Sequence, residues 1–140
     1  MRTKGLTLIE LMIVISVLAI LVMVAVPSYQ RYRDRAIMSS MVSFAEQLAV
    51  ALVNSKAATG AAFPSFSASS GEIISTPIGN FQVPKNIDSV VVSPKSCNSS
   101  GVVLPGASDS FEGFEIRLVA KSSKIPVLVW DSCDNSYKWL

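Results

Sequence analysis

A single carboxylate lies inside the most apolar part of this sequence. Residues 6–26, LTLIELMIVISVLAILVMVAV, contain only three polar side chains, those of Thr7, Glu10 and Ser16. An ionised carboxylate in an apolar medium costs at least a few kcal/mol when nothing compensates its charge. Glu10 therefore needs either a nearby cation or access to an aqueous surface.

The second feature that could carry chemistry is a pair of cysteines, Cys97 and Cys133, which both follow the apolar run. In an oxidising compartment two cysteines form one intramolecular disulfide. The alternative is a pair of buried free thiols. A disulfide would place the part of the chain after the run outside the cytoplasm.

Other catalytic chemistry has little support in this composition. The chain has no histidine, so general-base, triad and zinc schemes lack their usual residue. Glu112 with Glu115, and Asp131 with Asp134, are spaced closely enough to share a cation, but solvated strand and turn positions are the favoured explanation. The sequence predicts no catalytic residue, no metal and no cofactor, and the protein is not expected to be an enzyme.

The apolar run itself is predicted to be a membrane helix. As a helix its 21 residues would be about 31 Å long, close to the hydrocarbon thickness of a bilayer. A cleavable secretory signal usually has a shorter apolar core and a small-residue cut site, and a buried core helix would not need so unbroken an apolar surface. Charges on the two sides nearly balance and leave the orientation open: Arg2 and Lys4 precede the run, and Arg31, Arg33, Asp34 and Arg35 follow it.

An amphipathic helix is predicted over residues 28–54. Apolar residues recur there at steps of three and four, which marks one face of a helix. Pro27 would either kink a continuous helix or end the first one. A continuous helix over residues 6–54 would be about 70 Å long. The periodic residues are Ile37, Met41, Phe44, Leu48 and Leu52.

The remainder is predicted to be an antiparallel sheet. Gly60 ends the helical pattern, residues 61–79 have the composition of a long surface loop, and residues 80–140 carry the strands and the disulfide loop. The fold class is α+β, with a long N-terminal helix, half membrane-spanning and half amphipathic, packed on a C-terminal antiparallel β-sheet. The predicted strands are Ile87–Val92, Val102–Leu104, Phe114–Ala120, Val127–Trp130 and Tyr137–Leu140.

The N-terminal pattern resembles that of type IV pilins. Lys4-Gly5 is followed by LTLIEL over residues 6–11, with Glu10 in the fifth position after Gly5, and the run closes at Pro27. Tyr29 and Tyr32 extend the likeness to the major and minor pilins of the type IVa class. The specific match covers about the first quarter of the chain.

The resemblance implies processing and a location. Residues 1–5 would be a leader, cut between Gly5 and Leu6 by a prepilin peptidase that also N-methylates Leu6, where the family usually has phenylalanine. Residues 6–27 would span the inner membrane and later form the filament core, with residues 28–140 as a periplasmic and then extracellular head. An inner-membrane assembly platform and other copies of the chain would be its partners.

The same resemblance gives Glu10 a partner, namely the new amino terminus of a neighbouring subunit. Because pairing compensates the carboxylate only in the correct register, the charge would penalise misaligned packing of apolar helices. Thr7 and Pro27 are further candidate assembly positions. Glu10 could also reach the headgroups or pair with its own amine.

The predicted function is a structural subunit of a type IV pilus, a filament for adhesion, twitching motility or DNA uptake. One alternative is a pseudopilin of a type II secretion system. Another is a minor pilin at a filament tip that binds DNA or a host surface through a basic patch. The candidate patch contains Lys85, Lys95, Lys121, Lys124 and Lys138.

Overall fold

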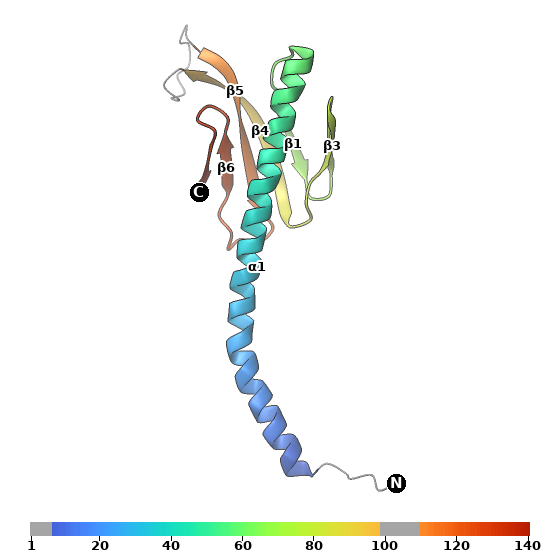
Figure 1. Cartoon of the computed structure of the whole chain (residues 1–140), viewed down its shortest axis with the longest axis vertical. Coiled ribbons are helices and arrows are strands. Elements are labelled where there is room, and N and C mark those ends of the chain that lie inside the picture. The colour runs from blue at the N-terminus through green and yellow to red at the C-terminus, as the bar shows by residue number, and fades with distance from the viewer. Residues whose placement is uncertain (1–6, 99–109) are drawn as a thin grey trace. The chain divides into compact units, whose positions relative to one another are not determined.

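The computed structural model describes residues 7–98 and 110–140, in two compact units that divide between Ala36 and Ile37. One long helix, α1 (Leu8–Thr59), begins in the first unit and ends in the second, which we call the head (Figure 1). The described strands all belong to the head: β1 (Phe66–Ser69), β2 (Ile73–Thr76), β3 (Gly79–Gln82), β4 (Ile87–Asn98), β5 (Ser110–Ala120), β6 (Leu128–Asp131) and β7 (Ser136–Trp139).

The helix α1 is continuous through Pro27, so the interpretation of Pro27 as a helix boundary is wrong. Pro27 has no N–H, which deprives the Met23 carbonyl of its usual donor, but no glycine interrupts the surrounding apolar and alanine-rich sequence. The helix ends at Thr59, five residues beyond the predicted end. Gly60 stops it with a positive φ of 68°, and its N–H donates to the Lys56 carbonyl at 2.7 Å.

The predicted amphipathic face of the helix forms one wall of the head's core. Met41, Phe44, Leu48 and Leu52 are buried, and Ile37 packs against their edge, as the three-and-four spacing indicates. Ala45, Ala49 and Ala51 of the helix are also buried. The core is completed by strand residues that include Val90, Val92, Phe114, Ile116, Leu118, Leu128 and Trp130.

The core sheet has five strands in the order β1-β4-β5-β6-β7, and every neighbouring pair is antiparallel. Strand β5 alternates as predicted, because Phe114, Ile116 and Leu118 are buried whereas Arg117 is exposed. Four of the predicted strands are confirmed, because they overlap β4, β5, β6 and β7. Strands β4 and β5 are longer than predicted, and the bounds of β6 and β7 are shifted by one residue. The fifth, Val102–Leu104, lies outside the described residues.

The loop predicted over residues 61–79 is wrong. This segment contains β1, which pairs with β4, and β2, which pairs with β3 in a separate two-stranded hairpin. Gly71, with a φ of 81°, provides the turn between β1 and β2. Strands β1 and β2 have only four residues each, and serine, alanine and proline dominate the composition of the whole segment. Ala68 and Ile74 nevertheless reach the core.

Candidate functional site

The carboxylate of Glu10 is paired within its own chain with Thr7. Glu10 Oε2 accepts hydrogen bonds from the Thr7 backbone N–H at 3.0 Å and from the Thr7 hydroxyl at 2.8 Å, and the Glu10 N–H donates to Thr7 Oγ1 at 3.3 Å. This reciprocal arrangement is a capping box, which satisfies free N–H groups at the start of a helix. Threonine followed three residues later by glutamate is the known signal of this box, but it was not among the features predicted from the sequence.

The other predicted processing and assembly residues lie apart from this pair. Gly5 and Leu6 fall outside the described residues, so their predicted cleavage and methylation stay predictions. Pro27 lies 17 residues beyond Glu10 on α1, about 25 Å along a helix. Of the predicted assembly positions that the structure describes, only Thr7 and Glu10 therefore lie together.

The apolar segment, which we define as residues 8–26, is not covered by any part of the chain that the structure describes. Its large apolar side chains are between 47% (Val26) and 80% (Met23) exposed, and the most apolar 18-residue window has a mean hydropathy of 3.0 with none of it buried. The length and composition suit a membrane span. The Ser16 hydroxyl donates back to the Met12 carbonyl at 2.8 Å, so this polar group is satisfied within the helix.

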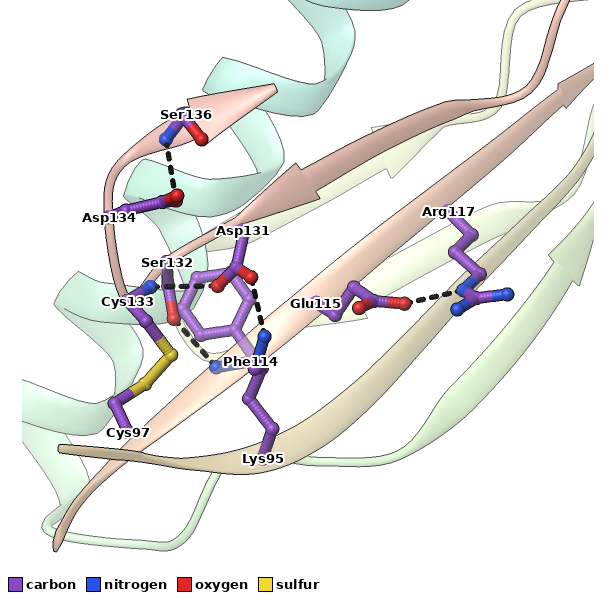
Figure 2. A network of polar contacts seen from close by, with 10 residues as sticks. All are labelled: Lys95, Cys97, Phe114, Glu115, Arg117, Asp131, Ser132, Cys133, Asp134 and Ser136. Carbon is purple, nitrogen blue, oxygen red and sulfur yellow. Dashed lines mark hydrogen bonds and ion pairs between the residues drawn. A yellow bond between two sulfur atoms is a disulfide. The ribbon is translucent and has the colours of Figure 1, made fainter. Parts of the chain in front are cut away.

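A disulfide joins Cys97, near the end of β4, to Cys133, in the turn between β6 and β7 (Figure 2). The free-thiol alternative is therefore wrong. Gly113 on β5 lies against the bridge, and a Cβ atom there would overlap Cys97 Sγ and come within 3.2 Å of Cys133 Sγ. The bridge ties together two segments that are 36 residues apart in the sequence.

Asp131 organises the polar groups around this bridge (Figure 2). Its Oδ1 accepts the Cys133 N–H at 2.9 Å, and its Oδ2 pairs with Lys95 Nζ at 2.5 Å. The side chains of Lys95 and Asp131 are only 15% and 21% exposed, so solvent screens this pair less than a surface pair. Beside them, the Phe114 N–H donates to the Ser132 hydroxyl at 2.7 Å.

The acidic pairs considered as cation sites have other partners. Glu112 pairs with Lys56 and Glu115 with Arg117, while Asp131 is held by Lys95. Among residues 7–98 and 110–140, no group of three potential metal ligands occurs.

Asp134 is supported by its neighbour Ser136. Ser136 lowers the pKa of the Asp134 carboxyl below its ordinary value, through its nearby hydroxyl and through its N–H. The N–H donates to that carboxylate at 3.3 Å, whereas the buried Ser136 Oγ has no hydrogen-bond partner among the described residues, so the N–H is the contact that the geometry supports. The exposed carboxylate thus stabilises the turn that carries Cys133.

The structure removes one residue, Lys95, from the candidate basic patch. Lys95 is half-buried and paired with Asp131, whereas Lys138 lies on β7 opposite Val129. The remaining lysines, Lys85, Lys121 and Lys124, are exposed and lie in turns.

A helix whose apolar segment is uncovered among the described residues, joined to a disulfide-bonded α+β head, fits the class of membrane-anchored subunits. Comparisons with known proteins agree with this class. Residues 1–26 match the family model described as the prokaryotic N-terminal methylation motif. The chain is 33% identical over 137 residues to a fimbrial protein of Neisseria meningitidis, a match that covers 97% of this chain and 71% of that relative. On this evidence the chain belongs to the type IV pilin family.

Further relatives match over the N-terminal region. The type IV major pilin protein PilE1 of Neisseria gonorrhoeae is 56% identical over 43 residues, which cover 31% of this chain and 26% of that protein. The type IV major fimbrial protein FimA of Dichelobacter nodosus is 45% identical over 49 residues, covering 35% and 31% respectively. No solved structure gave a significant match. The chain is thus a structural subunit of a pilus, and its named relatives are fimbrial proteins.

Proposed function

We propose that this pilin is made as a precursor, inserted into the inner membrane with its head in the periplasm, and assembled into an extracellular filament through residues 6–27. The bare apolar segment supports the proposal most directly, because a surface of that kind is stable only against lipid or against other apolar helices. The head has a core of its own and needs no cover from this segment.

In this proposal residues 1–5 are a leader that a prepilin peptidase removes between Gly5 and Leu6. The match to the methylation motif supports both the cut and N-methylation of Leu6 by the same enzyme. Removal of the leader also deletes Arg2 and Lys4, which leaves ten basic and ten acidic side chains in the mature subunit. A neutral subunit packs densely without net self-repulsion.

Glu10 then acts as the register element of the filament. Before assembly its carboxylate is compensated by the capping box with Thr7, which makes it tolerable near the membrane surface. After the cut, the amine on Leu6 of a neighbouring subunit offers a charged partner, which is a stronger one than a neutral hydroxyl. Only subunits in the correct register can replace the contact between Glu10 and Thr7 by a pairing between Glu10 and the neighbouring amine. The assembly platform would present subunits in that register, and the finished filament would serve attachment, surface motility or DNA uptake.

The test is to replace Glu10 by Ala in cells that otherwise assemble pili, with Ser16→Ala as the matched control. Both side chains are polar and lie in the same segment, but the hydroxyl of Ser16 is satisfied by its own helix. We expect the Glu10 variant to be inserted and cut normally, shown by the intact mass of a chain that starts at N-methyl-Leu6, yet to form few filaments. Abundant normal filaments from the Glu10 variant would contradict the register role, and an uncut chain in the wild type would contradict the processing step.

A further inference from the structure

The outer edge of β1 has no partner strand among the described residues. Strand β1 is the first strand of the core sheet and pairs only with β4. In an antiparallel pair, the N–H and C=O groups of successive residues point alternately towards the partner strand and away from it. The Ser70 N–H donates to the Asp88 carbonyl on β4 at 3.0 Å, so Ala68, two residues earlier, also faces β4. Ser67 and Ser69 therefore turn their backbone groups to the free edge.

The two residues on this edge differ in how their backbone groups are satisfied. The Ser69 N–H donates to Glu72 Oε2 at 2.8 Å, and the Ser69 carbonyl accepts the Glu72 N–H at 3.0 Å. These bonds confirm the outward direction of Ser69. Ser67 has the same direction, but its N–H and C=O groups bond to no residue that the structure describes. An unpaired strand edge of this kind is a template for another strand.

Strand β2 has a free edge of the same kind. Within the described chain it pairs only with β3, in the separate hairpin. The Val83 N–H donates to the Glu72 carbonyl at 2.9 Å, and the same alternation makes Ile74 face β3. Ile73 and Ser75 therefore turn their N–H and C=O groups away from β3, and these groups have no hydrogen-bond partner in the described part of the chain.

The two free edges border one cleft. Strands β1 and β2 follow each other in the chain but belong to different sheets, and Figure 1 shows β1 next to the hairpin that contains β3. The cleft between them has a volume of about 520 Å³, within the range of ligand-binding pockets. Part of its lining is buried and apolar, formed by Leu52, Ala68 and Ile74. The edge residues line it as well, so unpaired backbone groups stand on both of its sides, namely those of Ser67, Ile73 and Ser75.

The charge of the cleft favours a cationic occupant. Glu72 is the one charged residue among the described residues that line it, and its carboxylate forms no ion pair with a described cation. Lys85 lies near the same turn, because its carbonyl accepts the Ser70 hydroxyl at 3.3 Å, but it does not line the cleft. A strand in the cleft would alternate its side chains between the apolar lining and solvent. Apolar residues at every second position, with a lysine or arginine near Glu72, therefore fit this site.

We propose that the cleft between β1 and β2 is a docking site for an extended peptide segment of another protein, with apolar residues at every second position and a cation for Glu72. The peptide forms backbone hydrogen bonds to Ser67 on one side and to Ile73 and Ser75 on the other, and thereby joins the two sheets of the head. An edge strand of a second folded head fits less well, because it has one free row of backbone groups whereas the cleft offers two. The inference concerns the head alone and does not rest on leader cleavage or on the role of Glu10.

The experiment titrates the isotope-labelled full chain in detergent micelles with the peptide acetyl-Thr-Val-Thr-Val-Lys-amide and follows the backbone amides by NMR. We expect saturable shifts and slower hydrogen exchange at Ser67, Ile73 and Ser75, with no change at Tyr137 on β7, the other edge of the core sheet. The same peptide with both valine amides N-methylated cannot donate from those positions and should bind at least about fivefold more weakly. A peptide with glutamate in place of lysine should also bind more weakly, and Glu72→Gln should abolish that difference.

A matched pair of variants tests the edge of β1. Ser67→Pro removes an N–H that does not belong to the ladder with β4, and proline is tolerated on edge strands for this reason. It should weaken binding at least about fivefold, whereas Ser67→Ala, which keeps the N–H, should bind as the wild type does. Unchanged amide signals on β5 would show that the proline variant is folded. If it is not folded, the N-methylated peptide and Glu72→Gln decide.

Four results would each overturn the proposal: no binding of the peptide at millimolar concentration, equal binding of the N-methylated peptide, equal binding by the two folded Ser67 variants, or shifts that centre on β7 rather than on the cleft. Broadening of the β1 and β7 signals that grows with protein concentration, in the absence of any peptide, would assign the edge to a second copy of the chain instead.

Discussion

Replacement of Gly113 by Ala tests how closely the head is built around its disulfide. A Cβ atom at this position would overlap Cys97 Sγ and would lie 2.8 Å from Ser132 Oγ and 3.2 Å from Cys133 Sγ. Overpacking of this kind typically costs about 1–3 kcal/mol. If the bridge opens instead, the head loses roughly 4 kcal/mol, which is the chain-entropy estimate for cysteines 36 residues apart.

The same substitution should cost much less in a Cys97→Ala/Cys133→Ala background. Both sulfur atoms are then gone, and the remaining obstacle, the Ser132 hydroxyl, can rotate away. Rotation sacrifices the hydrogen bond that this hydroxyl accepts from the Phe114 N–H, worth about 1 kcal/mol. We therefore expect Gly113→Ala to lose at least half of its effect when the cysteines are absent.

The assay is urea unfolding of the full chain in detergent, followed by tryptophan fluorescence, because both tryptophans lie in the head. Titration of free thiols reports whether the bridge has formed. Gly71→Ala is the control, since Gly71 has a positive φ but no atom within 4 Å of the added Cβ, and its cost should be the same in both backgrounds. If Gly113→Ala lost the same stability with and without the cysteines, the close packing against the sulfur atoms would not be the cause.

Three further predictions concern the head. Leu48→Ala should lower its unfolding free energy by about 2–5 kcal/mol in the same urea assay, because this side chain is fully buried in the core. Lys56→Gln should cost at most about 1 kcal/mol, and less in high salt, because its ion pair with Glu112 is partly exposed; a larger, salt-independent loss would contradict this. Ser136→Ala should raise the pKa of Asp134 towards its ordinary value, as measured by NMR titration, whereas an unchanged pKa would refute the role of the Ser136 side chain. Because the folded-state pKa of Asp134 is depressed, its stabilising contribution is present at neutral pH and is lost as the pH falls through that pKa.

Periodicity predicted the helix and strand segments that are long enough to display a repeat of buried residues. The spacing from Met41 to Leu52 located the buried face of the helix, and the alternation from Phe114 to Leu118 located a central strand. Strands β1 and β2 escaped prediction because four residues are too few to display a period. Their pairing depends on β4 and β3, which local composition does not reveal.

The polar pairs also divide into those with a local sequence signal and those without one. The bond between Thr7 and Glu10 has a local signal, a three-residue spacing, although the charge of Glu10 points first to a cationic partner. The pair of Lys95 and Asp131 had no local signal, because 36 residues separate its members and only the sheet brings them together. Long-range ion pairs of this kind follow from topology and register rather than from motifs.

The bare apolar segment has a consequence for how filament growth depends on the amount of subunit. A subunit with this much apolar surface is not stable when dissolved in water, so in the proposed assembly it passes directly from lipid to protein surroundings. The quantity that governs assembly is then the number of subunits per unit area of membrane, not their concentration in a volume. A cell could change the rate of filament growth by crowding the same number of subunits into a smaller patch of membrane.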